Sequence, residues 1–211
     1  TKTSSREDYT YSAASKKAKR VAEDIGPPSS FCKWEKCDPI IFNHRPHSAD
    51  IPVTLYHEVF AHFQENCTSC LISKDDCDSV IELIVKMTAA FKLEDDRRKQ
   101  FSDWASDYFE LDITKLALPG PHQEADLWAG FSSGKNTFSL LIGEMKNEIG
   151  EGSRCPYIQA CASYAKQIGA NANSTIQKSL NPAFIIYIAG PYLGVAGAVF
   201  GNDFTMEPLT S

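Results

Sequence analysis

A glutamate and a lysine end a run of apolar residues in the segment TFSLLIGEMK, residues 137–146. The segment is typical of a strand, and residues two apart on a strand project from the same face. Glu144 and Lys146 should therefore project together, from the face that we expect to carry Leu140 and Ile142. Two opposite charges at the end of a strand that packs in the core indicate a functional role, so the pair is a candidate site.

The preceding segment EADLWAGF, residues 124–131, is also typical of a strand and contributes Asp126. The intervening residues SSGKN, 132–136, predict a hairpin loop, which makes the two strands antiparallel neighbours. Pairing centred on that loop sets Asp126 opposite Ile142, within one diagonal neighbour of Glu144. We therefore expect two carboxylates and a lysine to converge at one edge of a sheet.

This group of side chains suits the metal-assisted hydrolysis of a phosphodiester. Mg²⁺ prefers oxygen ligands and keeps several waters, so Asp126 and Glu144 would hold it and the Met145 carbonyl would add a ligand. The metal acidifies a bound water and screens the phosphate charge. Lys146 would orient or deprotonate that water, or stabilise the growing negative charge. The simpler interpretation is an exposed Glu144–Lys146 ion pair of little energetic weight.

The apolar periodicity predicts helices mainly before residue 111 and strands mainly after it. The order α-α-α-β-β-α-β-β-β predicts an α/β (α+β) fold, in which a helical N-terminal half packs on a mixed sheet. We expect a polar arm at residues 1–50 and one domain at residues 51–211. The expected helices are residues 50–67, 73–94, 95–111 and 155–169, and the expected strands are residues 124–131, 137–146, 183–190, 192–201 and 203–210.

Composition restricts the class of protein. Hydrophobic residues make up 43% of the 211 residues, enough for a substantial core. A formal net charge of −6 argues against coating nucleic acid by bulk charge, although it leaves room for a local basic groove. Seven irregularly spaced cysteines and the lack of an apolar signal segment at the start predict reduced thiols and an intracellular setting, and we expect the chain to be a piece of a longer protein. We expect no membrane span, because Pro191 interrupts the longest apolar run, residues 183–200.

Three local motifs resemble known sites but depart from them. In HEVFAH, His57 and His62 are five residues apart, about 140° around a helix, so they do not share a metal as zinc-protease histidines do. GFSSGKNT is one residue shorter than a P-loop and carries Asn136 where a magnesium-binding hydroxyl belongs. The two cysteine-containing sets lack the paired spacing of a zinc finger, so structural Zn²⁺ is not our expectation. These sets are Cys32, Cys37, His44 and His47, and Cys67, Cys70 and Cys77.

The arrangement of Asp126 and Glu144-x-Lys146 on a hairpin, followed by a helix with Gln159, resembles the PD-(D/E)XK nuclease superfamily, whose fold is restriction-endonuclease-like. The segments EMKNEIGEG, PYIQ and NPAFIIYIAGPYLGVAGAVF are similar to the nuclease-like domain of fungal Crinkler-type effector proteins, over roughly residues 50–210. Ala125 stands where the superfamily's name has proline. The helix motif Gln-xxx-Tyr is also altered, since Ser163 stands four residues after Gln159 and Tyr164 five.

The resemblance implies a core of order α-β-β-α-β with extra C-terminal strands, and a hydrolase that cleaves DNA, or RNA, with Mg²⁺ or Mn²⁺. Asp126, Glu144 and Lys146 would form the catalytic set, with Gln159 on the helix in support. An acidic residue on the helix before the motif strands often joins such a site, and Glu94 is our candidate, with Glu58 second. Tyr164 would point about 140° away from Gln159 and pack instead.

Four basic residues are our candidates for nucleic-acid contacts: Arg97, Arg98, Lys135 and Lys166. A Crinkler-type effector would be secreted and then act in the cytoplasm or nucleus of a host cell. The alternative function is a catalytically inactive nuclease-fold module that binds nucleic acid or protein and regulates a linked kinase-like domain. The negative net charge favours this alternative. A homodimer, which would allow both strands to be cut, stays open.

Overall fold

The computed structural model describes residues 40–43, 50–118, 123–134, 136–150, 155–170, 179–201 and 203–210. These residues form a mixed α/β structure built on a seven-stranded sheet in the order β1-β7-β6-β5-β4-β3-β2. The strands are β1 (Ile40–Phe42), β2 (Thr114–Ala117), β3 (Glu124–Ser133), β4 (Asn136–Lys146), β5 (Ala183–Ala189), β6 (Tyr192–Phe200) and β7 (Phe204–Pro208). The helices are α3 (Val53–Tyr56), α4 (Glu58–Ser69), α5 (Lys74–Thr88), α6 (Glu94–Phe109) and α7 (Pro156–Ala170). The expected mixed α/β class is confirmed.

The sheet is antiparallel at its β2-β3-β4 side and parallel where α7 carries the chain from β4 to β5. Strands β5, β6 and β7 are antiparallel, and β1 pairs parallel with β7. Because Ile40–Phe42 belong to the sheet, the boundary that we expected at residue 50 lies too far along the chain. Strands β1 and β2 are only three and four residues long, too short for an alternating pattern to predict them.

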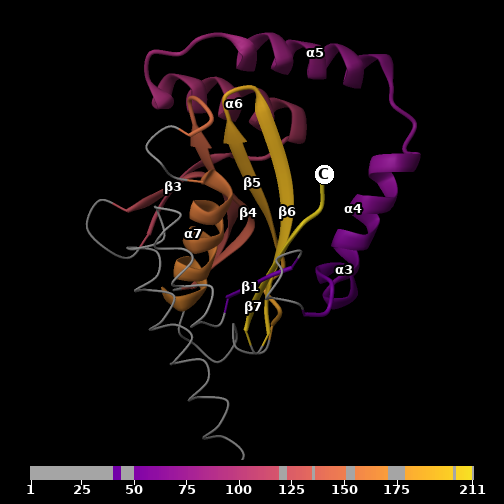
Figure 1. The fold of residues 1–211 in the computed structure, drawn as a ribbon, viewed down its shortest axis with the longest axis vertical. Helices are drawn as coiled ribbons and strands as arrows, with labels where there is room; N and C mark the ends of the chain where they lie inside the picture. The colour runs from indigo at the N-terminus through magenta and orange to yellow at the C-terminus, as the bar shows by residue number, and fades with distance from the viewer. Residues whose placement is uncertain are drawn as a thin grey trace, which may run out of the picture.

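Each face of the sheet has its own core. The helices that cover the sheet are seen in Figure 1. Helix α7 packs on one face, against side chains such as Ile142 and Ile185. Helix α6 packs on the other with Phe101 and Trp104, against side chains such as Ile186. The central strands β4 and β5 are therefore buried on both sides, which explains their nearly continuous apolar sequences.

The helix expected at residues 50–67 is interrupted at His57. This residue is extended and ends α3, and its Nδ1 accepts a hydrogen bond from the Val59 N–H at the start of α4. Val53 and Phe60 are fully buried on the β6 side, where a Cβ at Gly197 would lie only 2.9 Å from the Val53 side chain. The break therefore lets both helices press against the sheet. Over the described ranges, no helix combines the length and apolarity needed to cross a membrane.

Candidate active site

A β-bulge in β4 sets the position of the two carboxylates. Near the hairpin loop Gly130 pairs with Ser139, but the next pair is Ala129 with Leu141, so Leu140 is an extra residue without a partner in β3. Beyond the bulge Leu127 pairs with Gly143, and the next residues, Asp126 and Glu144, lie close enough for their carboxyl groups to share a hydrogen bond. Without the extra residue Asp126 would oppose Gly143, and the two carboxylates would face opposite sides of the sheet.

The expected pairing of Asp126 with Ile142 is wrong by two residues. The hairpin loop between Ser133 and Asn136 contains two residues rather than five, and the bulge adds one more to β4. Leu140 also does not share the buried face of Ile142, since its side chain is 48% exposed while that of Ile142 is fully buried. The convergence of Asp126 with Glu144 is therefore closer than the sequence predicts.

A second bulge lies in β3 at Asp126 itself. Thr114 of β2 pairs with Trp128 and Leu116 pairs with Ala125, so β3 has one more residue than β2 across this interval. On a regular strand, residues two apart face the same side of the sheet. Here Ala125 packs in the α7-side core and Leu127 in the α6-side core, so the bulge rotates β3 between them. Bulges of this kind re-aim side chains next to functional sites.

Glu144 is a buried carboxyl, 6% exposed, on the α7 side of the sheet. The Ser163 hydroxyl of α7 donates a hydrogen bond to Glu144 Oε1 at 2.7 Å. Burial raises the pKa of Glu144 well above its usual range, and the neighbouring Asp126 raises it further by its charge and by a hydrogen bond. The bond from Ser163 and the charge of Lys146 oppose this rise only in part. Two adjacent carboxyl groups thus share one poorly solvated place, where a proton or a cation is needed.

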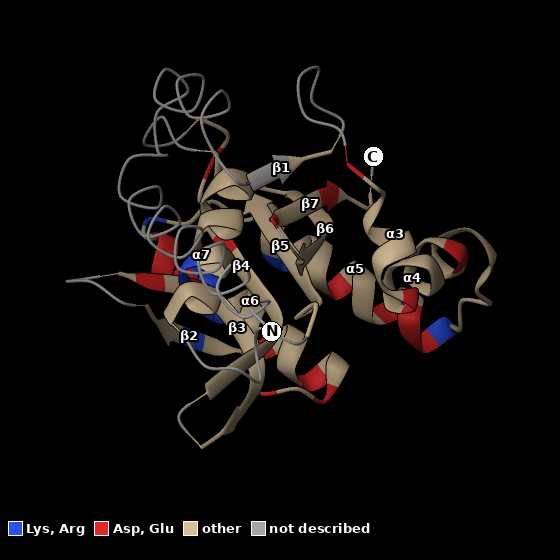
Figure 2. Ribbon diagram, turned by 90° about the horizontal axis from the view of Figure 1, so that it is seen from below, with Lys and Arg blue, Asp and Glu red and all other residues tan. Residues whose placement is uncertain are grey.

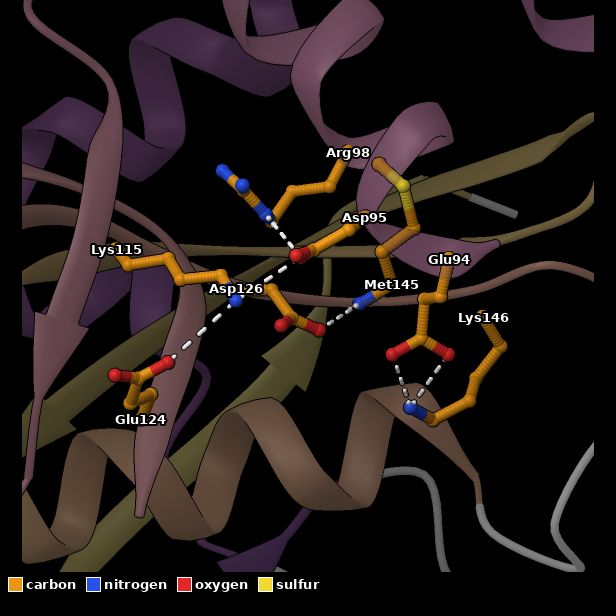
Figure 3. A network of polar contacts seen from close by, with 8 residues as sticks. All are labelled: Glu94, Asp95, Arg98, Lys115, Glu124, Asp126, Met145 and Lys146. Carbon is orange, nitrogen blue, oxygen red and sulfur yellow. Dashed lines mark hydrogen bonds and ion pairs between the residues drawn. The ribbon is translucent and has the colours of Figure 1, made fainter. Parts of the chain in front are cut away.

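Asp126 is held by the backbone of β4 (Figure 3). Its Oδ2 accepts a hydrogen bond from the Met145 N–H at 3.1 Å. The N–H and C=O groups of one strand residue point to the same side, so the Met145 carbonyl is also directed towards β3. Lys146 has the opposite backbone orientation, since its carbonyl accepts from the Gly190 N–H beyond β5. The expected Met145 carbonyl ligand is therefore on the correct side of the strand.

Lys146 and Glu94 form an ion pair across the end of the sheet (Figure 3). The Lys146 Nζ lies 3.0 Å and 2.9 Å from the two carboxylate oxygens of Glu94. Glu94 is the first residue of α6, and both side chains are largely shielded from solvent. The structure thus brings together Asp126, Glu144, Lys146 and Glu94. Glu58, the second acidic candidate, begins α4 instead.

The helix α7 contributes one residue that the sequence did not single out as part of the site. Ser163 bonds to Glu144, whereas the expected Gln159 lies one turn earlier on the same side of α7. The Gln159 Oε1 is buried and has no hydrogen-bond partner among the described residues. Tyr164 is fully buried and its hydroxyl donates to the Asn181 carbonyl, which confirms that it packs. In the sequence, the four-residue spacing from Gln159 to Ser163 is what indicates that both residues lie on the same face of α7, towards the site.

The donor chemistry fits a hard divalent cation. Two carboxylates and a backbone carbonyl are oxygen ligands, and Mg²⁺ takes one or two carboxylates while keeping several waters. No group of three or more His, Cys, Asp or Glu side chains that could hold a metal ion occurs in the described part of the chain. Asp126 and Glu144 would supply two carboxylate ligands, with water completing the coordination.

Two of the four expected nucleic-acid contacts are wrong. Arg97 is only 1% exposed, and its guanidinium donates to the carbonyls of Met87, Ala89 and Gly190. Lys166 is also buried, within α7. Neither side chain is on the surface, because each belongs to the packed side of its helix. Lys135 lies outside the described residues.

Arg98 belongs to a chain of ion pairs beside the site (Figure 3). Its Nε lies 3.1 Å from Asp95 Oδ1, which also lies 3.0 Å from the Nζ of Lys115 on β2. These two cations lower the pKa of Asp95. Lys115 also lies 3.5 Å from Glu124, two residues before Asp126. The sequence did not predict Lys115 here, since β2 itself was not predicted.

Asp and Glu outnumber Lys and Arg on the outer helices α4 and α5 (Figure 2). Comparison of the chain with family models, with curated proteins and with solved structures finds no significant match. The arrangement of the side chains themselves therefore carries the functional argument.

Proposed function

We propose that this chain is a magnesium-dependent nuclease that hydrolyses phosphodiester bonds of DNA. The observation that carries the proposal is the contact between the Asp126 and Glu144 carboxyl groups across the bulged hairpin, with Glu144 buried and its pKa raised. Two acids in one poorly solvated place need either a bound proton or a cation between them, and a divalent cation would satisfy both carboxylates at once. Lys146 lies two residues further along the same strand, where it completes the Glu-x-Lys pattern.

The order of elements around the site supports the proposed superfamily. Helix α6, the antiparallel strands β2-β3-β4, the crossover helix α7 and the parallel strand β5 contain the α-β-β-α-β order of a restriction-endonuclease-like core. The candidate residues also come from the elements that this resemblance assigns to them. We extend the proposal to a Crinkler-type effector on the sequence resemblance alone.

Each residue has a role that follows from its surroundings. Glu144 would give up its proton and, together with Asp126, bind a divalent cation through oxygen, aided by the Met145 carbonyl. The bound cation would supply an acidified water and screen the phosphate charge. Ser163 orients the Glu144 carboxylate, and Lys146, released from Glu94, would stabilise negative charge on the phosphate. Arg98 and Lys115 lie beside this position as contacts for the neighbouring backbone phosphates.

Cleavage of supercoiled plasmid DNA tests the proposal. We expect nicking with Mg²⁺ or Mn²⁺ that EDTA abolishes, a loss of about 10³-fold in Asp126→Asn, and a loss of about 10²-fold or more in Lys146→Ala. Asp107→Asn, an exposed acid near the other end of α6, is the matched control and should cleave normally. Nicking that persists in both site variants would refute the mechanism. A parent protein that never nicks would favour the inactive binding module.

A second test measures metal affinity without cleavage. Ser163→Ala removes the hydrogen bond to Glu144 Oε1, and groups that orient a ligand typically change metal affinity by about 10- to 100-fold. We therefore expect weaker Mn²⁺ binding in calorimetry, with Ser163→Thr retaining most of the affinity because it keeps the hydroxyl. Equal Mn²⁺ affinity in Ser163→Ala and the parent would show that the serine does not support a metal ligand.

A further inference from the structure

Helix α5 has two apolar faces, and among the described residues only one of them is packed. The packed face lies against α6, where Met87 is buried and Leu83 is partly buried. Trp104 Nε1 donates to Ser79 of α5, and the Tyr108 hydroxyl donates to Asp76 at the start of α5. These contacts fix which side of α5 faces the domain. Figure 1 shows α5 at the periphery of the molecule, beyond α6.

The other face carries four large aliphatic residues that are exposed: Val80, Ile81, Ile84 and Val85, between 43% and 66%. Two of them belong to a stripe formed by Cys77, Ile81, Ile84 and Thr88, all exposed, with spacings of four, three and four residues. This alternation is the pattern by which one helix packs along another in a coiled coil. No acidic or basic residue lies on the stripe. The helix itself is well formed, with a capping box between Ser73 and Asp76.

The exposed stripe is complementary to the same stripe of a second copy in the antiparallel orientation. In an antiparallel pairing centred between Ile81 and Ile84, Ile81 of one copy meets Ile84 of the other, and Cys77 meets Thr88. The same register sets Val80 opposite Val85. Every apolar residue of the face then meets another apolar or small residue.

Charge selects the antiparallel orientation. The first turns of α5 hold Asp75, Asp76 and Asp78 against Lys74, whereas its second half holds one acid and one base, Glu82 and Lys86, which form an ion pair. A parallel pairing would bring two acidic ends together. An antiparallel pairing sets each acidic end near the electrically balanced end of the other copy and also opposes the two helix dipoles favourably.

We propose that the exposed face of α5 is a homodimer interface, in which α5 of a second copy packs antiparallel along it. A helix of 15 residues spans about 22 Å. Such a contact is smaller than a standard interface of about 800 Å² per partner, so we expect a weak dimer. The proposal depends on α5 alone and not on the proposed nuclease activity.

Sedimentation velocity over a wide range of protein concentration tests the interface. We expect the full chain to pass from monomer to dimer as concentration rises, and Ile81→Glu/Ile84→Glu to stay monomeric throughout. Leu55→Glu, an exposed aliphatic residue of α3, is the matched control and should dimerise like the parent. A parent that stays monomeric, or a double variant that still dimerises, would overturn the proposal.

Disulfide trapping tests the register without adding charge to the helix. The background replaces every cysteine except Cys77 and the buried Cys161 by serine. Adding Thr88→Cys should then produce a covalent dimer under mild oxidation, because Cys77 meets position 88 of the other copy. The background with Cys77 alone should stay uncrosslinked. Crosslinking through Cys77 alone, or none with Thr88→Cys, would contradict the antiparallel register.

Discussion

Glu144→Gln should abolish DNA cleavage and at the same time stabilise the metal-free protein. Cleavage should fall by about 10³-fold, because a neutral amide is a poor ligand for a hard divalent cation. The melting temperature without metal should rise by a few degrees, the shift that roughly 1 kcal/mol gives in a chain of this size. The gain arises because the amide removes an ionisable group from a buried place that it shares with Asp126.

The pH dependence of stability has a definite sign. Since folding raises the pKa of Glu144, the unfolded chain loses this proton at a lower pH than the folded protein does. Stability of the metal-free parent should therefore decrease as the pH rises from the unfolded pKa, about 4.5, through the raised folded pKa. Glu144→Gln should lack this part of the decrease. Thermal melts over a pH series measure the difference between the two proteins.

Glu207→Gln provides the matched control, because Glu207 and Glu144 are equally buried at 6% exposed. The Glu207 carboxylate accepts hydrogen bonds from the Val53 N–H and the Asn43 side chain, and these two donors compensate for its burial. Glu207→Gln should lose about 1 kcal/mol and keep its cleavage activity. Added Mg²⁺ should raise the melting temperature of the parent and of Glu207→Gln but not of Glu144→Gln. A metal-free Glu144→Gln protein less stable than the parent would contradict a site built for a cation.

The sequence was sufficient to predict the elements that carry the site. The alternation in β3 and β4 and the helical pattern of α7 are strong local signals, and they place Asp126 and Glu144 on adjacent strands. The exact register is not a local property. It depends on the bulge at Leu140 and on a two-residue loop, and the stretch 132–136 is compatible with several loop lengths.

Buried polar residues were the main errors of the sequence-based predictions. Arg97 looks like a surface residue in a strongly charged segment, and one of its carbonyl partners, Gly190, lies 93 residues further along the chain. Ser163 looked like a departure from a helix motif until its hydroxyl was placed against Glu144. Long-range partners of this kind leave no trace in local periodicity, because they depend on which elements the fold brings together.

Arg97→Met should destabilise the protein by roughly 3 to 5 kcal/mol. Its guanidinium lies 2.5 Å from the Met87 carbonyl, 2.9 Å from that of Gly190 and 3.2 Å from that of Ala89. It also lies 4.5 Å from the centre of the Phe91 ring. Methionine fills similar space but donates nothing, so the carbonyls at the C-terminal end of α5 and in the β5–β6 turn lose their donor. Each buried polar group left without a partner costs about 1 to 3 kcal/mol.

Urea unfolding of Arg97→Met beside Arg98→Met separates this role from loss of a surface charge. Arg98 is the adjacent residue and pairs with Asp95, whose side chain is 65% exposed, so its replacement should cost less than about 1 kcal/mol. Similar values for the two variants would show that Arg97 does not hold these elements together.

The loss of the Arg97 hydrogen bonds should also affect the site, because Arg97 lies one turn after Glu94 and bonds to Gly190, whose N–H donates to the Lys146 carbonyl. At a temperature where Arg97→Met stays folded, its cleavage should therefore fall less than that of Lys146→Ala, since the lysine is still present but held less firmly.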